Sequence, residues 1–150
     1  MLNQKGDAAD AIKARFGTVW PVHLAAFTKL LTGLRACFDG DLDLLLVLAV
    51  ISERTRPEEW NPEIYTYRHL TRDDGAGSAL KINLQSVAEY SGIPRETVRR
   101  KVGILVRKGW VSRDENGFLS VSGQAALDLE DATGHSIAYL SALWSAFASE

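Results

Sequence analysis

Residues 82–102 read INLQSVAEYSGIPRETVRRKV, and they decide the predicted fold because they describe two short helices joined by a tight turn. Asn83 is a favourable N-cap for the first helix, since its side-chain oxygen can accept a backbone N–H that lacks a partner within the helix. Gly92 stands where the turn needs a backbone with positive φ. Pro94 opens the second helix, where its missing N–H costs nothing. We therefore predict a helix-turn-helix over residues 83–108.

The second helix of this pair, residues 94–108, has two chemically different faces. We expect its buried stripe to consist of Val98, Val102, Leu105 and Val106. The outer face carries charged and polar side chains near its N-terminal end, namely Arg95, Glu96, Thr97, Arg99 and Arg100. In helix-turn-helix proteins that bind DNA, this end of the second helix enters the major groove. The pattern therefore predicts a recognition helix.

A β-hairpin is predicted directly after this helix. Trp110 leads into two alternating stretches that meet at an Asn-Gly pair at residues 116–117, which favours a tight turn. The tip carries Asp114 and Glu115, which DNA phosphates would repel, so we expect the hairpin mainly to brace the domain. Of the hairpin's side chains, only Arg113 is expected near the DNA backbone. The predicted fold is therefore mainly α with a small β-wing, a winged helix-turn-helix flanked by N- and C-terminal helices.

Charge is distributed unevenly along the chain. The formal net charge is −2, which by itself argues against a nucleic-acid partner. Residues 84–113 nevertheless carry seven basic and two acidic side chains, so this segment has a charge of +5 and the rest of the chain −7. A basic element on an acidic body is suited to local binding of phosphate. A solvated helix face is the alternative that the charges alone leave open.

Helical segments flank the predicted winged helix within a single domain of residues 1–150. The predicted parts are a helical dimerisation segment at 7–38, a winged-helix core at 41–122 with an irregular insertion at 55–79, and a C-terminal helix at 124–148. We expect an interruption between Gly17 and Pro21 in the first segment, and a break at Thr133-Gly134 in the last.

Both flanking segments carry an apolar seam, because large apolar side chains recur at steps of three and four residues. The seams consist of Leu24, Phe27, Leu31 and Leu34 near the N-terminus, and of Ile137, Leu140, Trp144 and Phe147 near the C-terminus. We predict that they form a homodimer interface, since two-fold assembly doubles the contact that one short recognition helix can make. The alternative is that the two segments pack on each other within one monomer.

Other classes of function find little support in the sequence. The longest apolar run, residues 44–51, is far shorter than the ~20 residues that span a bilayer, and the N-terminus lacks the apolar stretch of a signal peptide. Cys37 is the only cysteine, so a reducing cytoplasm is the expected setting. His23, His69 and His135 are too scattered to suggest a metal site. We expect no catalytic residue and no cofactor.

Aromatic side chains raise one further possibility, a pocket for a small-molecule effector. The residues that could line it are Trp20, Trp60, Tyr65, Tyr67 and Trp144. Ordinary packing in a small core is the simpler interpretation, so an effector remains a secondary expectation.

Residues 91–100, SGIPRETVRR, resemble the recognition segment of bacterial winged-helix transcriptional regulators. The RETV-x-R pattern at 95–100 is similar to the catabolite-activator/FNR class, in which the matching Arg, Glu and Arg read bases. Residues 92–95, together with 109–111 and the wing, are equally similar to the IclR class, and the flanking helices give a MarR-like layout. Lys101 stands where these families bury an aliphatic residue, so we expect the helix to be tilted or loosened there.

The residues and the resemblance together predict a sequence-specific double-stranded DNA-binding transcriptional regulator that acts as a homodimer. Arg95, Glu96 and Arg100 would read bases. The phosphates would be contacted by Thr97, Arg99, Arg107, Lys108 and, from the wing, Arg113. Two alternatives stay open: a winged helix used for protein interaction without DNA binding, and a plasmid-maintenance or replication-type DNA-binding protein.

Overall fold

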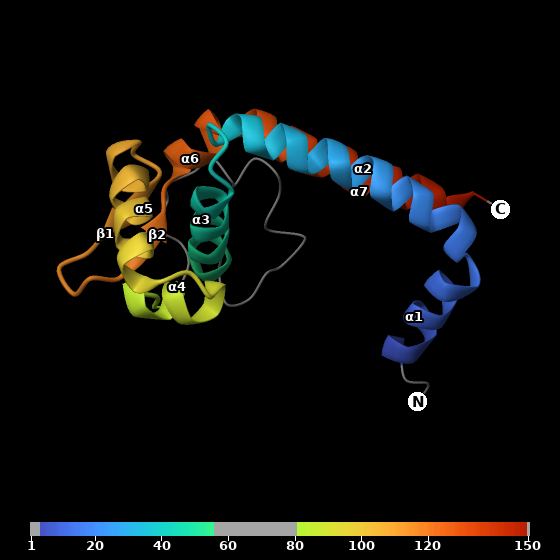
Figure 1. The fold of residues 1–150 in the computed structure, drawn as a ribbon, viewed down its shortest axis with the longest axis horizontal. Helices are drawn as coiled ribbons and strands as arrows, with labels where there is room; N and C mark the ends of the chain where they lie inside the picture. Colours follow the sequence, from blue (N-terminus) through green and yellow to red (C-terminus); the bar gives the residue numbers. More distant parts are fainter. Residues whose placement is uncertain (1–3, 56–80, 150) are drawn as a thin grey trace.

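A computed structural model of the chain describes residues 4–55 and 81–149, and in these ranges the fold is mainly helical with a small antiparallel sheet (Figure 1). The mainly α fold class with a small β element is confirmed. In chain order the elements are α1 (Gln4–Ala14), α2 (Phe16–Cys37), α3 (Leu42–Thr55), α4 (Leu84–Ser91), α5 (Arg95–Arg107), β1 (Val111–Arg113), β2 (Leu119–Val121), α6 (Gly123–Asp128) and α7 (Glu130–Ala148). The predicted insertion at 55–79 lies outside the described residues, apart from Thr55.

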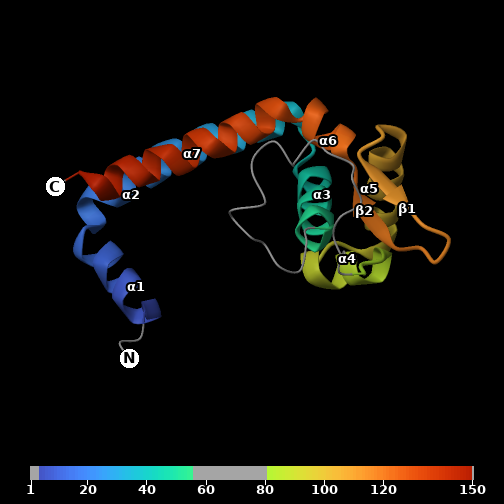
Figure 2. The same ribbon diagram turned by 180° about the vertical axis from the view of Figure 1, so that it is seen from behind.

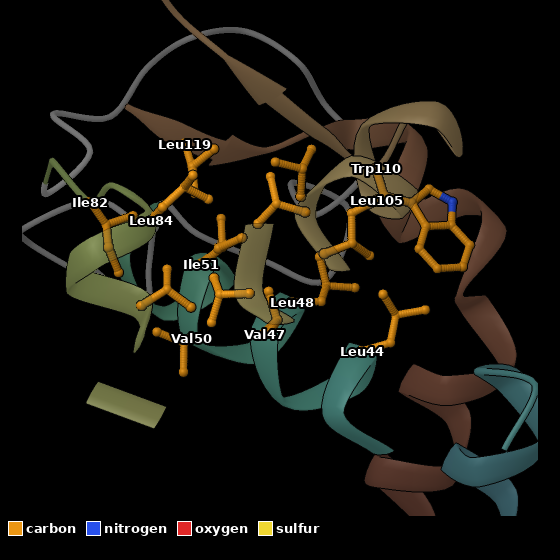
Figure 3. Packing of buried hydrophobic residues seen from close by; sticks show 14 of the residues in the cluster. Leu44, Val47, Leu48, Val50, Ile51, Ile82, Leu84, Leu105, Trp110 and Leu119 are labelled. Atoms are coloured by element: carbon orange, nitrogen blue, oxygen red, sulfur yellow. The ribbon is translucent and has the colours of Figure 1, made fainter. Parts of the chain in front are cut away.

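The elements from α3 to α6 form one unit around a shared apolar cluster, which we call the core domain. The cluster draws side chains from α3, α4, α5 and both strands (Figure 3). α3 is its central helix, because Val47 and Ile51 are fully buried and the helix packs against α4, α5 and β2. Asp41 caps α3, since its carboxylate accepts the backbone N–H of Leu44 at 2.9 Å. Leu105 of α5 is fully buried on the same cluster.

The two strands pair in register, with Val111 opposite Val121 and Arg113 opposite Leu119. Two hydrogen bonds from β2 tie this small sheet to other segments. The Leu119 N–H donates to the carbonyl of Ile82 at 2.8 Å. The Val121 N–H donates to the hydroxyl oxygen of Thr55 at 3.0 Å. The sheet is therefore fastened to α3 and to the segment before α4.

The loop between the strands is longer than the two-residue turn that the Asn-Gly pair predicts. It spans residues 114–118, and the Asp114 carboxylate accepts the backbone N–H groups of Asn116 and Phe118 at 2.9 and 2.8 Å. Gly117 takes the positive φ of 83° that closes the loop. Asp114, predicted only as a tip charge that repels phosphate, is thus also the side chain that folds the loop.

α2 and α7 form a second unit, which we call the helical hairpin. The two helices run antiparallel and side by side, away from the core domain (Figures 1 and 2). α1 projects from the far end of the hairpin, on the same side as the core domain (Figure 1). None of the helices in the described ranges is both long and apolar enough to cross a membrane.

The breaks in the flanking helices do not lie where the sequence predicts them. α1 and α2 are separated at Arg15, whereas Pro21 lies inside α2. Arg15 fixes this corner, because its guanidinium donates to the carbonyl of Phe147 at 2.6 Å and also to that of Ser149, at the C-terminal end of α7. The break between α6 and α7 lies at Leu129, and α7 continues through residues 133–134.

Candidate nucleic-acid interface

α4, the turn at residues 92–94 and α5 have the local geometry that the sequence predicts. Asn83 caps α4, with its side-chain oxygen 3.0 Å from the backbone nitrogen of Ser86. Gly92 ends α4 in the left-handed conformation with φ 75°. Ile93 is buried between the helices, and Pro94 is the N-cap of α5, one residue before its predicted place within the helix. The turn therefore holds the two helices in a fixed relation.

The inner face of α5 is narrower than predicted. Val98, Val102 and Leu105 are buried, as expected from their spacing. Val106 is exposed, which corrects its assignment to the buried stripe. At 100° per residue, Val106 lies roughly 75° from the centre of that stripe, which places it at the border of the buried face.

The outer face of α5 carries charge along most of its length. Glu96, Arg100 and Arg107 lie opposite the buried stripe, Arg99 lies about 90° from the centre of the stripe, and Arg95 stands in the first turn at a smaller angle from it. All five side chains are exposed, and Thr97 is partly buried. Of the predicted base-contacting residues, Glu96 and Arg100 therefore share the outer face, and Arg95 is exposed beside them at the N-terminal end of α5.

Glu96 and Arg99 form an exposed ion pair on this surface. The Arg99 guanidinium donates from Nη2 to one carboxylate oxygen at 2.7 Å and from Nε to the other at 3.0 Å. The hydrogen bond to Arg99 lowers the pKa of Glu96, and the charges of Arg100 and Arg95 act in the same direction. Glu96 is thus an ionised acceptor whose direction is set by its neighbour one turn on.

Lys101 does not loosen α5, contrary to the expectation from the family pattern. Its ammonium group pairs with the Asp41 carboxylate at the start of α3, and both side chains are partly buried. Partial burial would raise the pKa of Asp41, but hydrogen bonds from Lys101 and from the Leu44 amide outweigh it and lower the pKa. This ion pair joins α5 to α3 across 60 positions of sequence.

The remaining predicted phosphate contacts lie at different places. Lys108 sits past the C-terminal end of α5, with its ammonium 3.8 Å from the Asp39 carboxylate and 4.9 Å from the centre of the Trp110 ring. Arg107 continues the outer face of α5. Arg113 ends β1, and its guanidinium lies over Gly117 in the β-hairpin loop. Within residues 4–55 and 81–149, neither Arg107 nor Arg113 has an acidic partner within 4.0 Å.

Sequence reasoning missed the contacts that hold this surface in place. The buried Trp110 donates from its indole nitrogen to the Asp128 carboxylate at 2.9 Å, which lowers the pKa of Asp128 and ties β1 to α6. Phe38 packs edge-on against the same indole ring. Capping and turn signals are local, but these partners and the Lys101–Asp41 pair are distant in sequence, so no short-range pattern could show them.

The other residues considered from the sequence have structural surroundings. His23 lies 2.9 Å from the Tyr139 hydroxyl, and His135 packs over Gly33, so both contribute to the contact between α2 and α7. Cys37 is partly buried against the core. Among the described residues, no three His, Cys, Asp or Glu side chains come together as metal ligands would.

Of the five aromatic residues suggested for an effector pocket, Trp60, Tyr65 and Tyr67 lie outside the described residues, as does His69. Trp20 and Trp144 are exposed on the helical hairpin. A pocket enclosed by these two is therefore not seen, and an effector stays a prediction.

Comparison with known proteins adds no family. No family model matches the chain, and neither a curated protein nor a solved structure matches it.

Proposed function

We propose that the core domain is a winged helix-turn-helix and that the chain is a sequence-specific double-stranded DNA-binding transcriptional regulator of the cytoplasm. The observation that carries the proposal is the accessible surface of α5, where Arg100 and Arg107 are exposed on the outer face and Arg95 is exposed at the N-terminal end. These three side chains have no acidic partner within 4.0 Å among the described residues. α5 would lie in the major groove, with its N-terminal residues against the bases.

The other side of α5 supports this role because it is rigidly held. Val98 and Leu105 are fully buried, and the Lys101–Asp41 pair fixes α5 against α3. A recognition helix must keep its side chains in register with the edges of the bases. A helix that is anchored along one face does so with little loss of conformational entropy on binding.

The charges of the outer face suggest how bases would be read. Arg95 and Arg100 can each pair with O6 and N7 of guanine, and Glu96 can accept from N4 of cytosine. Arg99 holds the Glu96 carboxylate in the free protein, at 2.7 Å. Arg99 would therefore orient Glu96 as well as contact a phosphate.

Phosphate contacts would come from the borders of the same surface. Thr97 and Arg107 lie on α5, Lys108 follows it, and Arg113 extends from β1. Asp39 already lies 3.8 Å from Lys108, so we expect Lys108 to contribute less than Arg107.

A protein-interaction module without DNA binding is the competing function, and one observation favours it. Large apolar side chains are exposed along the helical hairpin, Trp144 most of all at 78 %. A plasmid-maintenance or replication role would use the same α5 surface, so it differs in the target and not in the site.

Selection of bound duplexes from a random pool, at about physiological salt, tests the proposal. The wild-type chain should enrich a defined motif, and Arg95→Ala/Arg100→Ala should not, since each bidentate guanine contact is worth about 1–3 kcal/mol of discrimination. Lys29→Ala/Arg35→Ala removes the same charge from exposed positions of α2 and should leave the motif unchanged.

Salt dependence separates the two candidate functions. Affinity for the selected duplex should fall with salt with a log–log slope of about −0.9 per phosphate contact. Arg107→Ala should reduce that slope by about one without changing the motif. If the wild-type protein enriches no sequence, and any binding to duplex DNA is insensitive to salt, the proposal of DNA binding is wrong. Protein interaction is then the better-supported function.

A further inference from the structure

The helical hairpin exposes large apolar side chains along most of its length. We call this set the apolar underside; its members are Phe16, Trp20, Leu24, Phe27 and Leu31 of α2, and Ile137, Leu140, Trp144 and Phe147 of α7. Their exposed fractions lie between 38 and 78 %. Seven of these nine belong to the two predicted seams, and Leu34, the eighth predicted seam residue, is partly buried. α2 and α7 do pack on each other within the chain, but they do so mainly through other residues.

That contact runs along a different line of each helix. On α2 the contact includes Val19, His23 and Gly33. On α7 it includes Tyr139 and other residues that lie on the same face of that helix as Tyr139. At 100° per residue, the exposed seam of each helix is rotated by about 100–120° about the helix axis from the line of contact. The rotation has the same sense in both helices when each is followed from its N-terminus to its C-terminus. α2 and α7 run antiparallel (Figures 1 and 2), so rotations of similar size bring both seams to the same side of the hairpin.

The apolar underside continues into the core domain. Phe38 follows the α2 seam at the same helical angle, and it is buried against Trp110. Leu129 stands at the corresponding position before α7, where it packs on the core cluster. The underside therefore faces the side on which the core domain lies. The opposite side of the hairpin carries small residues, including Ala25 and Ser145.

The size of the underside matches a protein interface. A large aromatic side chain contributes roughly 150–250 Å² when it is fully covered. At the observed exposures, the nine side chains correspond to on the order of 800 Å² per copy. This exceeds the roughly 300–600 Å² of the largest apolar patch on a typical monomer, and it equals the area that each partner contributes to a standard interface.

We propose that the apolar underside binds the underside of a second copy of this chain, so that two helical hairpins form a four-helix bundle. An antiparallel two-helix layer that is apolar on one side is half of such a bundle, and a two-fold axis covers both halves with the same residues. All nine residues are uncharged, so self-association brings no like charges together.

A lipid surface fits the same face less well. Amphipathic helices that bind membranes carry many Lys and Arg side chains on their polar side. Away from the underside, α2 and α7 together carry only two basic side chains, Lys29 and Arg35, among small residues such as Ala25 and Ser145. Two basic residues over two long helices are few compared with the basic face of a membrane-binding helix.

The position of α1 agrees with a partner on the underside. The described side chains of α1, residues 6–14, are all exposed, and a helix of this length is marginal without a surface to pack on. α1 and the core domain project from the same side of the hairpin at its two ends (Figure 1). A partner hairpin on the underside would lie between them and give α1 a surface to contact.

Sedimentation analysis of the full chain over a wide concentration range, without DNA, tests the proposal. The wild-type chain should have the mass of a dimer. Leu24→Glu/Leu140→Glu should have the mass of a monomer, because it places charge on both halves of the underside. Ala25→Glu/Ser145→Glu adds the same charge to the opposite side of the same helices and should remain a dimer.

A milder variant keeps the test valid if the double glutamate variant does not fold, which its circular dichroism would show. Trp144→Ala removes a side chain that is 78 % exposed in the monomer, so the monomer should fold normally. The dissociation constant of the dimer should nevertheless rise about tenfold or more, as at an interface hot spot.

Three results would overturn the proposal: a monomeric wild-type chain at every concentration, a dimer that neither variant weakens, or sedimentation of the monomer with anionic vesicles. Because DNA is absent from the measurement, each of these results leaves the proposed function untouched.

Discussion

The core domain and the helical hairpin bury their apolar residues in opposite ways. In the core domain, large side chains such as Ile51 and Leu105 are inaccessible to solvent. In the hairpin, the buried residues are the small ones, Val19, Ala132 and Ala146, while Trp144 and its large neighbours are exposed. Both regions contain many large apolar residues, and the difference lies in how completely these are covered.

This difference shows which region covers its apolar side chains within one chain and which does not. The core domain has the packing of a unit that gains its stability from its own interior. The hairpin is held by one line of contact and by specific links such as His23–Tyr139 and the Arg15 cap. A completed core domain can present α5 in a fixed position, whereas the hairpin needs a further surface to cover its apolar side.

The largest effect expected from this comparison comes from the same substitution made in both regions. Leu105→Ala should lower the free energy of unfolding by about 2–5 kcal/mol, because it leaves a cavity in a fully packed core. Leu140→Ala, at a side chain that is 62 % exposed, should have little effect on the dilute chain. Urea unfolding at low protein concentration measures both. Equal losses would mean that the hairpin is packed as tightly as the core domain.

The same pair of variants sharpens the comparison when the protein concentration is raised. If the underside is covered by a second copy, the loss caused by Leu140→Ala should grow with concentration, because dimerisation then contributes to stability. The loss caused by Leu105→Ala should stay constant at concentrations where the oligomeric state is unchanged.

A smaller effect is expected where the core domain uses a partly buried ion pair. Lys101→Met should lower the free energy of unfolding by about 1–2 kcal/mol at neutral pH, between the values for exposed and fully buried pairs. The control is Lys13→Met, which removes the exposed pair of Lys13 with Asp10 at 3.7 Å and should change little. If Lys101→Met is as stable as the wild type, the pair does not fasten α5 to α3.

The pH dependence of this ion pair follows from the pKa of Asp41. The pKa is lower in the folded chain than its ordinary value of 3.8, so the pair contributes stability above pH 4 and loses it as the pH falls through the folded pKa. The wild-type chain should therefore lose more stability than Lys101→Met between neutral pH and pH 3. Parallel acid unfolding curves of the two proteins would contradict the assignment.

The smallest effects concern two glycines of the α4–α5 segment, and they should have opposite signs. Gly92→Ala should lower the free energy of unfolding by about 1–2 kcal/mol, because Gly92 has a φ of 75° and the left-handed conformation is unfavourable for a residue with a Cβ atom. Gly103→Ala should add about 0.5–1 kcal/mol, since Gly103 is helical and a new Cβ would meet only the flexible end of Arg107 at 3.4 Å. Thermal unfolding of both variants measures the signs; a gain for Gly92→Ala would mean that the turn tolerates another conformation.

Sequence reasoning was most successful where a residue acts on its own backbone. The Asn83 cap, the left-handed Gly92 and the strands on either side of residues 116–117 are confirmed, and α5 starts one residue after its predicted first residue, Pro94. It failed at the helix breaks, because Gly17 and Pro21 are weak helix formers only on average. The actual break at Arg15 is set by hydrogen bonds to the end of α7. Arg15 and Phe147 are 132 residues apart in the sequence, so no local preference encodes this contact.

The candidate site divides in the same way. The sequence alone determined that α5 has a buried stripe and a charged outer face, because both follow from the 3.6-residue period of a helix. The direction of Glu96 toward Arg99 is likewise local, one turn along the same helix. Only the tertiary structure decided that Lys101 pairs with Asp41, that Trp110 binds Asp128, and that the seams of α2 and α7 lie exposed on one side. Periodicity gives each helix its faces, but which face meets which depends on how the helices dock, and docking is settled by contacts between residues far apart in the chain.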